Sequence, residues 1–286
     1  MADELLEQIP EFQKGSGPKP AEEGFIDWSA LTSVPMARNA REALIIAGVA
    51  VAIVLVAEFL IRAFEIPTYV LPAPSGVFNS LVTSFDVLWP HLLVTLQELV
   101  LGYAIGALIG IVLAGVITRL PFVEKIITPY IILLVTTPML ALMPLLVLKL
   151  GFGLEPRIIV VALAVGPMVM INAATGFRRT DLPKIALARS YGATTMQIFF
   201  KIRFPMALPM IIVGLMVGGI FGLLTAVGAE MVGSGGSGGL GTRLTYYSSL
   251  ARMEPFFATI VIIAAIGISM YVLFYFIGKR WASWEA

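Results

Sequence analysis

The chain has 286 residues, of which 58% are hydrophobic and 13% are charged, and its formal net charge is +1. Soluble domains carry about 25% charged residues, so this composition excludes a soluble protein and indicates that lipid surrounds most of the chain. The small net charge gives no indication of nucleic-acid binding. The absence of cysteine excludes disulfides, thiolate metal sites and cysteine catalysis, and a single histidine, His91, excludes a histidine-rich metal site.

The first 42 residues are polar and rich in acidic side chains. A secretory signal peptide has the opposite pattern, a basic start followed by an apolar stretch. We therefore expect residues 1–42 to form a cytoplasmic N-terminal tail. The first apolar run, which begins near residue 43, is expected to act as an uncleaved membrane anchor.

Six apolar runs are each long enough to cross a bilayer, which requires about 20 mostly apolar residues. Within a transmembrane domain of residues 43–280, the predicted spans are about 44–63, 93–118, 126–148, 158–177, 206–229 and 256–278. Pro138, Pro144 and Pro167 interrupt the third and fourth spans. In a membrane, the carbonyl groups that lose their hydrogen bond at a proline need protein neighbours or a water-filled cavity. The prolines therefore indicate either a polar pathway beside these spans or a simple kink in each helix.

The basic residues predict the orientation, because cytoplasmic segments carry an excess of lysine and arginine. With both termini in the cytoplasm, the inside segments hold 14 of the 19 basic residues, six of them in the loop 178–205. The outside loops are then residues 65–90, where Ser75 is expected to cap a short helix, and the glycine-rich stretch 232–254. A C-terminal tail, residues 281–286, follows the last span.

Ionisable side chains inside spans are candidate functional sites. Glu58 and Arg62 lie four residues apart in the first span and can pair with each other. Glu98 lies deeper, in the second span, without an obvious local partner, so a pathway position and a buried hydrogen bond are both open. Glu230 ends the fifth span, where a gate and a surface position are equally open. The candidate pathway or gate residues are Glu98, Pro138, Met139, Pro144 and Glu230.

The loop 178–205 is predicted to form two short helices on the cytoplasmic face. Thr180 or Asp181 can cap a helix over residues 182–191, and Gly192 supplies its C-terminal stop because glycine adopts a left-handed backbone easily. Thr194 or Thr195 can cap a second helix over about residues 196–203. Pro205 and Pro209 then mark the start of the fifth span.

The spacing in this loop resembles the coupling loop of binding-protein-dependent ABC importer permeases. That family's pattern is Glu-Ala-Ala, three residues, Gly, nine residues and Ile-x-Leu-Pro. Gly192, Ile202 and Pro205 stand at the corresponding positions, and Ala188 holds the second alanine. The chain departs from the pattern where alanine replaces glutamate, leucine replaces the first alanine and phenylalanine replaces leucine, at Ala186, Leu187 and Phe204.

The resemblance covers about residues 65–280. Six further motifs are similar to those of the aliphatic sulfonate, taurine and nitrate importer permeases: Tyr69-Val-Leu-Pro-Ala-Pro-Ser75, His91-x3-Thr95-Leu96, Gly102-Tyr-Ala-Ile-Gly106, Pro138-x5-Pro144-Leu145, Leu150-Gly-Phe-Gly153 and Gly239-Leu-Gly241. They occur in that group's order.

The resemblance implies an all-α membrane protein with six transmembrane helices and the type I ABC importer permease fold, in the bacterial inner membrane. It implies three kinds of partner: a second permease chain in a homodimer, two ATP-binding ABC subunits and an external solute-binding protein. The chain would have no catalytic residue, no metal and no cofactor, because ATP and Mg belong to the ATPase. The implied solute is a small anion such as a sulfonate, taurine or nitrate. The residues implied to meet the ATPase are Ala186, Leu187, Ala188, Arg189, Gly192, Ala193, Thr194, Ile202 and Pro205.

Two other classes of membrane protein fit less well. A stand-alone secondary transporter or channel is the alternative, but such transporters are commonly built from internal repeats, and none is visible here. An intramembrane zinc protease needs two histidines, and an aspartyl protease needs aspartates in its spans, which hold none. The stretch Gly233–Gly241 lacks the Gly-Lys-Ser/Thr ending of a phosphate-binding loop, so we expect it to form a flexible loop or a close-packed turn.

Overall fold

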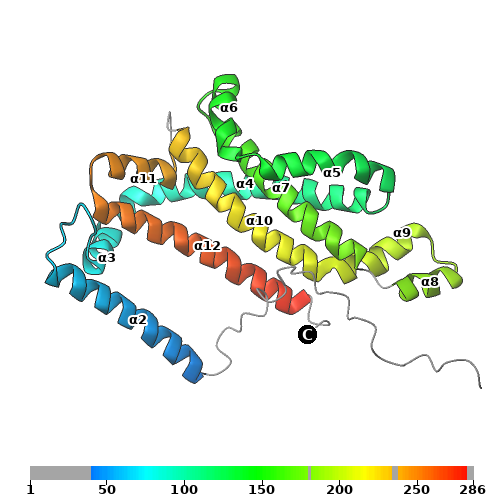
Figure 1. Ribbon diagram of the computed structural model, residues 1–286, viewed down its shortest axis with the longest axis horizontal. Helices are drawn as coiled ribbons and strands as arrows, with labels where there is room; N and C mark the ends of the chain where they lie inside the picture. The colour runs from blue at the N-terminus through cyan, green and yellow to red at the C-terminus, as the bar shows by residue number, and fades with distance from the viewer. Residues whose placement is uncertain (1–39, 180–181, 234–237, 282–286) are drawn as a thin grey trace, which may run out of the picture. The chain divides into compact units, whose positions relative to one another are not determined.

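The computed structural model describes residues 40–179, 182–233 and 238–281, and every regular element within them is helical (Figure 1). The expected tail up to residue 39, the caps at Thr180 and Asp181, and the C-terminal tail from residue 282 lie outside the described residues. The helices in chain order are α2 (Ala40–Ala63), α3 (Pro74–Thr83), α4 (Phe85–Ile117), α5 (Pro121–Thr136), η1 (Met139–Leu142), α6 (Met143–Leu150), α7 (Glu155–Arg178), α8 (Leu182–Ser190), α9 (Thr195–Ile198), η2 (Phe199–Arg203), α10 (Phe204–Val232), α11 (Leu240–Ser249) and α12 (Met253–Trp281).

Five of the described helical stretches are long and apolar enough to cross a membrane by themselves. They contain the predicted first, second, fourth, fifth and sixth spans. The fifth stretch runs over Thr195–Val232, so the helix predicted at about 196–203 continues directly into the fifth span. Residues 199–203 form a π-helical turn in which the Phe204 N–H donates to the Phe199 carbonyl. This wider turn lets the helix continue although Pro205 has no N–H to donate.

The predicted third span, residues 126–148, is the exception. It is a broken pair, Pro121–Thr136 and Met139–Leu150, whose axes differ by 87°. Thr137, which precedes Pro138, is extended with φ −77° and ψ 126°, as the proline ring requires of its predecessor. Pro144 lies in the first turn of α6, where proline is tolerated, and Pro167 lies inside the unbroken α7. Of the three prolines expected to break helices, only Pro138 does so.

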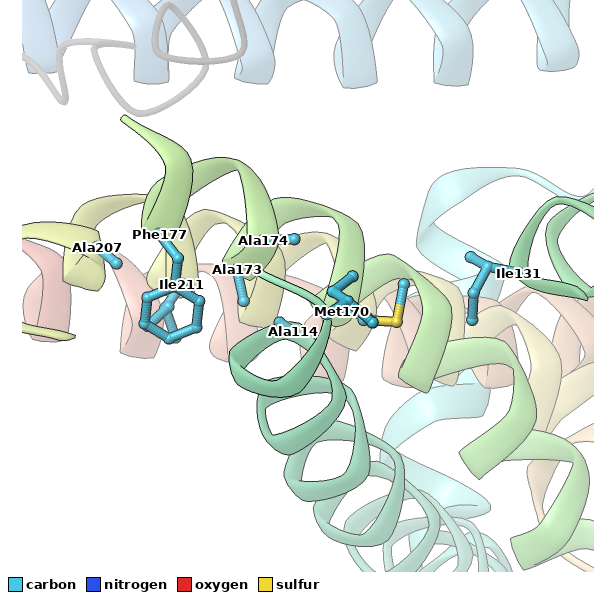
Figure 2. Packing of buried hydrophobic residues seen from close by; sticks show 9 residues of the cluster. Ala114, Ile131, Met170, Ala173, Ala174, Phe177, Ala207 and Ile211 are labelled. Atoms are coloured by element: carbon cyan, nitrogen blue, oxygen red, sulfur yellow. The ribbon is translucent and has the colours of Figure 1, made fainter. Parts of the chain in front are cut away.

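The centre of the fold is a close packing of α4, α7 and α10. Glycines spaced four residues apart on α4 let the α7 backbone approach: a Cβ on Gly106 would lie 2.6 Å from the Ala162 carbonyl oxygen, and one on Gly110 would lie 2.5 Å from that of Gly166. Such small-residue stripes are how membrane helices gain contact without a hydrophobic driving force. Side chains from α4, α5, α7 and α10 meet beside this contact in one buried cluster (Figure 2): Ala114, Ile131, Met170, Ala173, Ala174, Phe177, Ala207 and Ile211.

The first span, α2, is bonded near its C-terminal end to the start of α3. The expected pair between Glu58 and Arg62 is present, at 2.6 Å. Ser75 was expected to cap the following helix, but Ala73 is the N-cap residue, and it makes no side-chain cap bond. The Ser75 hydroxyl instead donates to the Glu58 carboxylate at 2.7 Å and accepts from Arg62 at 3.1 Å. These bonds tie the end of α2 to the start of α3.

Candidate functional site

The segment from α8 to the π-helical turn, residues 182–203, takes its shape from local backbone bonds. At the end of α8 the Gly192 N–H donates to the Arg189 carbonyl at 2.9 Å, and the Ala193 N–H donates to the Ala188 carbonyl at 3.0 Å. These two bonds are a Schellman motif, which requires a left-handed residue, and Gly192 has φ +76°. The helix stops where the sequence places its glycine.

The next helix, α9, starts two residues later. The Thr194 hydroxyl accepts from the Gln197 N–H at 3.3 Å, and the Gln197 side chain accepts from the Thr194 N–H at 2.8 Å. This reciprocal capping box identifies Thr194, rather than Thr195, as the cap. The turn between α8 and α9 is thus bounded on both sides by satisfied backbone groups.

Aromatic and apolar contacts attach this segment to the helix bundle. Ile185 and Ile198 are buried, and the Phe199 ring lies 5.3 Å from the ring of Phe177 at the end of α7. The guanidinium of Arg119, in the turn between α4 and α5, lies 4.2 Å from the centre of the Phe199 ring. The segment is therefore held from two sides.

The segment also exposes large apolar side chains, one of which, Met196, contacts the Arg119 guanidinium through its sulfur at 3.4 Å. Tyr191 is 84% exposed, Leu187 59% and Met196 57%. Sequence analysis missed Tyr191 and Met196, although an apolar residue beside a helix stop was a visible signal. Of the residues expected to meet the ATPase, five are exposed, namely Ala186, Leu187, Arg189, Gly192 and Thr194, and four are half-buried, namely Ala188, Ala193, Ile202 and Pro205.

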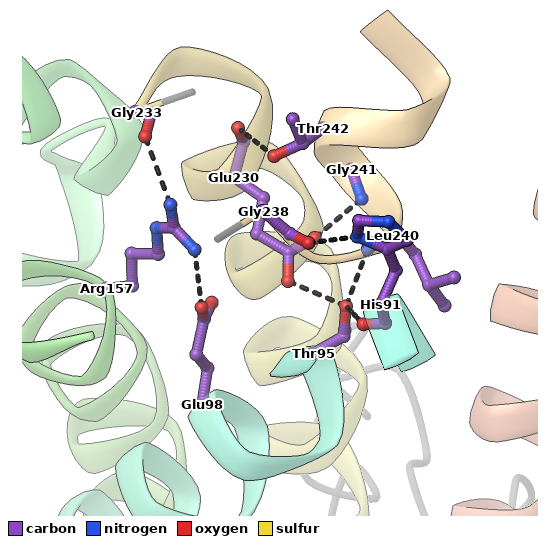
Figure 3. A network of polar contacts seen from close by, with 10 residues as sticks. All are labelled: His91, Thr95, Glu98, Arg157, Glu230, Gly233, Gly238, Leu240, Gly241 and Thr242. Carbon is purple, nitrogen blue, oxygen red and sulfur yellow. Dashed lines mark hydrogen bonds and ion pairs between the residues drawn. The ribbon is translucent and has the colours of Figure 1, made fainter. Parts of the chain in front are cut away.

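A second set of polar contacts is buried where α4, α7, α10 and α11 meet (Figure 3). Glu98 is fully buried and forms an ion pair with Arg157 of α7 at 2.6 Å. Arg157 also donates to the Gly233 carbonyl at 3.1 Å. Sequence analysis found no partner for Glu98, because Arg157 is distant from it in sequence. The ion pair makes Glu98 a structural contact between two helices.

Glu230 makes the other half of this set and is also fully buried. One carboxylate oxygen accepts from the Thr95 hydroxyl at 2.7 Å, and the other accepts from the Gly241 N–H at 2.5 Å. The Thr95 hydroxyl accepts in turn from the Leu240 N–H at 2.9 Å. Glu230 thus binds the start of α11, a helix that lies in a stretch predicted to be a loop, and it does not lie at the surface.

The described glycines at the end of this stretch are closely packed, which fits one of the two possibilities that the sequence left open. A Cβ on Gly239 would collide with the Glu230 carboxylate, and one on Gly241 would collide with the Val227 carbonyl. His91 also reaches this turn and contacts the Gly238 carbonyl through Nδ1. Residues 234–237 lie outside the described residues.

We expect Gly241→Ala to lower the free energy of unfolding by about 1–3 kcal/mol, because the added methyl group meets a backbone carbonyl that cannot move aside. Gly48→Ala is the matched control, since a Cβ there meets no atom within 4 Å and alanine favours helix. Thermal unfolding of both variants in the same detergent measures the difference. Equal midpoints would contradict the packing argument.

The candidate pathway residues separate into two groups. Pro138 and Met139 line a pocket of about 330 Å³ between the broken third span, α7 and α10, together with Pro167, Thr137 and Thr225. Pro144, Glu98 and Glu230 do not line it. The pocket contains no charged side chain. Within the described ranges, no three His, Asp or Glu side chains gather as a metal site would need.

Comparison with known proteins connects these features to a family. Residues 106–283 match the family model described as binding-protein-dependent transport system inner membrane component. A probable ABC transporter permease protein of Haemophilus influenzae is 30% identical over 205 residues, which cover 72% of this chain and 83% of the relative. The taurine transport system permease protein TauC of Escherichia coli (strain K12) is 29% identical over 222 residues, covering 75% and 80%.

A solved structure supports the fold. The crystal structure of an amino acid ABC transporter with histidines aligns with a TM-score of 0.53 at 21% identity, covering 71% of this chain and 97% of that chain. At this identity the similarity concerns the fold alone.

Proposed function

The chain belongs to the family of binding-protein-dependent transport system inner membrane components, and from this premise we propose that its segment 182–203 receives the work of a separate ATPase. As an ABC transporter permease it is a multi-pass membrane subunit without catalysis of its own. We further propose that two copies pair around the solute path, that two ATP-binding subunits dock on the side of α8 and α9, and that an external binding protein delivers the solute to the other side.

The observation that carries this proposal is the exposed face of residues 182–203. Tyr191, Leu187 and Met196 expose their side chains at the end of the bundle, where the loop's basic residues predict water rather than lipid. Large apolar side chains exposed to water within one short segment favour a partner surface. The satisfied turn at Gly192 gives this face a defined backbone shape, and a shape of that kind can transmit force.

The segment is also connected to the helices that would have to move. Phe199 belongs to the unbroken stretch Thr195–Val232 and packs against Phe177 of α7. A displacement of α8 and α9 would therefore pass directly into α7 and α10, and these two helices line the 330 Å³ pocket beside Pro138. ATP binding and hydrolysis on the partner would open this path alternately to the two sides of the membrane.

We propose a sulfonate, taurine or nitrate as the solute, supported by the similarity to a taurine permease. The pocket near Pro138 has no charged side chain, so the selection would be made mainly by the external binding protein. The bacterial inner membrane and a cytoplasmic position of both termini follow from the same proposal.

Reconstitution tests the function directly. In proteoliposomes, the chain with its ATPase and binding protein is expected to take up solute only when ATP is present. The chain without the ATPase is expected to show no flux above that of empty vesicles. Flux through the isolated chain would contradict the proposal and support a stand-alone transporter or channel.

A further inference from the structure

A second pocket, of about 620 Å³, lies between α3, α11 and the start of α12. Its volume is in the usual range of small-molecule sites. Unlike the pocket near Pro138, its wall is polar: the α3 side and the start of α4 contribute Asn79, Ser80, Thr83 and Ser84. It also holds side chains of both charges, Arg243, Arg252 and Glu254.

The helix α11 places one arginine in this pocket. Its residues Leu240, Leu244 and Tyr247 recur at helical spacing and are buried against the bundle. Arg243 and Tyr246 lie on a neighbouring stripe and line the pocket, with the guanidinium carbon 5.5 Å from the centre of the Tyr246 ring. The ring supports the flat side of the guanidinium and leaves its edge for a ligand.

Arg243 lines the pocket, but only part of its guanidinium is available to a ligand. Its Nε atom is buried and has no hydrogen-bond partner among the residues that the structure describes, so a ligand in the pocket does not reach it. The two Nη groups of an arginine form a pair of donors, which a carboxylate or sulfonate can match with two oxygens. An oxyanion in the pocket would therefore accept from the Nη groups.

Glu254 supplies the opposite charge on the other wall. It makes no ion pair of 4.0 Å or less with Arg243 or Arg252 in the described part of the chain, so the charges of the pocket are held apart. The carboxylate lies against α3, where a Cβ on Gly76 would be 2.8 Å from Oε1.

The turn that joins α11 to α12 is strained beside this pocket. Ala251 has φ +53°, a conformation that a residue with a Cβ rarely adopts. The Ala251 N–H donates to the Ser248 carbonyl at 3.1 Å, and the Arg252 N–H donates to the Tyr247 carbonyl at 2.9 Å. These two bonds form a Schellman motif like the one at Gly192, so the left-handed Ala251 is the helix stop of α11, and Arg252 directly after it lines the pocket.

We propose that this pocket binds a small zwitterion, with its oxyanion on Arg243 and its ammonium group on Glu254. A simple inorganic anion would satisfy the arginine and leave Glu254 beside it without a counter-charge. An aminosulfonate or an amino acid satisfies both. The inference deepens the proposed function, on which it rests, by naming the solute class and a site for it outside the pocket near Pro138.

Calorimetry on the full-length chain in phosphatidylglycerol nanodiscs tests the proposal with three probes: 2-aminoethanesulfonate, ethanesulfonate and ethylamine. The aminosulfonate is expected to bind about tenfold or more tightly than either single-charge probe, because each charged hydrogen bond contributes a factor of that size. Equal affinities, or no binding of the aminosulfonate, would overturn the proposal.

Two substitutions assign the two charges. Arg243→Gln is expected to weaken the aminosulfonate and ethanesulfonate by about tenfold or more, and Arg243→Lys to recover only part, since lysine lacks the pair of donors. Glu254→Gln is expected to lower the affinity for the aminosulfonate to that for ethanesulfonate. The affinity for ethanesulfonate is expected to stay unchanged. Arg179→Gln, outside the pocket, is the control. Unchanged binding in Arg243→Gln would place the ligand elsewhere.

A phosphatidylethanolamine headgroup presents the same pair of charges. Binding of the aminosulfonate is therefore compared in discs with and without this lipid. If the lipid weakens binding to the wild type but not to Arg243→Gln, the lipid headgroup occupies the pocket. If the lipid leaves binding to the wild type unchanged, the pocket is a site for the soluble solute. ATP-driven uptake is measured separately. If ATP-driven uptake occurs but the aminosulfonate does not bind in discs, the proposed binding site is wrong and the proposed function stands. If the aminosulfonate binds but ATP-driven uptake is absent, the proposed function is wrong and the binding site stands.

Discussion

Replacing Gly192 by tryptophan is expected to abolish docking of the ATPase, and with it solute uptake, while the chain inserts and folds normally. Gly192 is exposed, and a Cβ there meets no atom of the described chain within 4 Å, so a side chain can leave this position without a clash at its first atom. The remaining internal effect is the left-handed backbone, φ +76°, which costs an ordinary residue about 1–2 kcal/mol. Bulk on the exposed turn therefore acts mainly on whatever docks there.

Gly151→Trp separates docking from strain. Gly151 also has a positive φ, +84°, and a Cβ there also meets no atom within 4 Å. Its ψ of −177° places it in a region that is almost restricted to glycine, so tryptophan is strained at least as much as at Gly192. Co-purification of the ATPase with each variant is the measurement. Docking lost in both variants, or kept in Gly192→Trp, would show that the segment 182–203 is not the coupling element.

A milder variant distinguishes whether apolar contact or backbone shape is responsible for docking of the ATPase. Tyr191→Ser removes an exposed ring and leaves the Schellman bonds in place. If apolar contact carries the docking, affinity for the ATPase falls by about tenfold, as for the loss of an aromatic interface anchor. If only backbone shape matters, the affinity stays unchanged.

Replacing Arg157 by methionine is expected to destabilise the chain by about 3–5 kcal/mol, because it leaves the carboxylate of Glu98 buried without a counter-charge. The Gly233 carbonyl loses its donor at the same time. Yield and thermal unfolding in detergent report the loss. The double variant Glu98→Leu with Arg157→Met removes both charges and is expected to recover most of the stability.

The pair between Glu124 and Arg178 is the control for burial. Its atoms are equally close, at 2.5 Å, but the side chains are 35% and 52% exposed. Arg178→Met should therefore change stability by no more than about 1 kcal/mol, because water solvates the carboxylate that remains. A loss as large as that of Arg157→Met would show that proximity of the charges, and not their burial, decides the effect.

The sequence was most informative where structure is local. The stop at Gly192, the cap at Thr194 and the pair between Glu58 and Arg62 each join residues at most five apart, and all three are present. The same holds for the apolar runs, since a bilayer-length run depends only on its own residues. The family resemblance also rested on motif order along the chain, and the family match confirms it.

Predictions failed where a residue's role depends on a distant one. Serine is a favoured N-cap residue, but the hydroxyl of Ser75 donates to the Glu58 carboxylate instead. The stretch after Gly233 looked like a loop, yet buried Glu230 accepts the N–H of Gly241 and stabilises the start of α11. The proline at 138 indicated a break, but nothing in the run 126–148 specifies an angle of 87°.

Composition, apolar runs and local turns thus determined that this chain is a helical membrane protein and which family it resembles. They also determined where the helix before Gly192 ends and where the helix after Thr194 begins. Only the tertiary structure decided that Glu98 and Arg157 are a pair, that Glu230 is buried, and that Arg243 and Glu254 face one pocket. The reason is physical. Backbone geometry and transfer into lipid are set by neighbours in sequence, whereas a buried charge is paired by whichever helix packs against it.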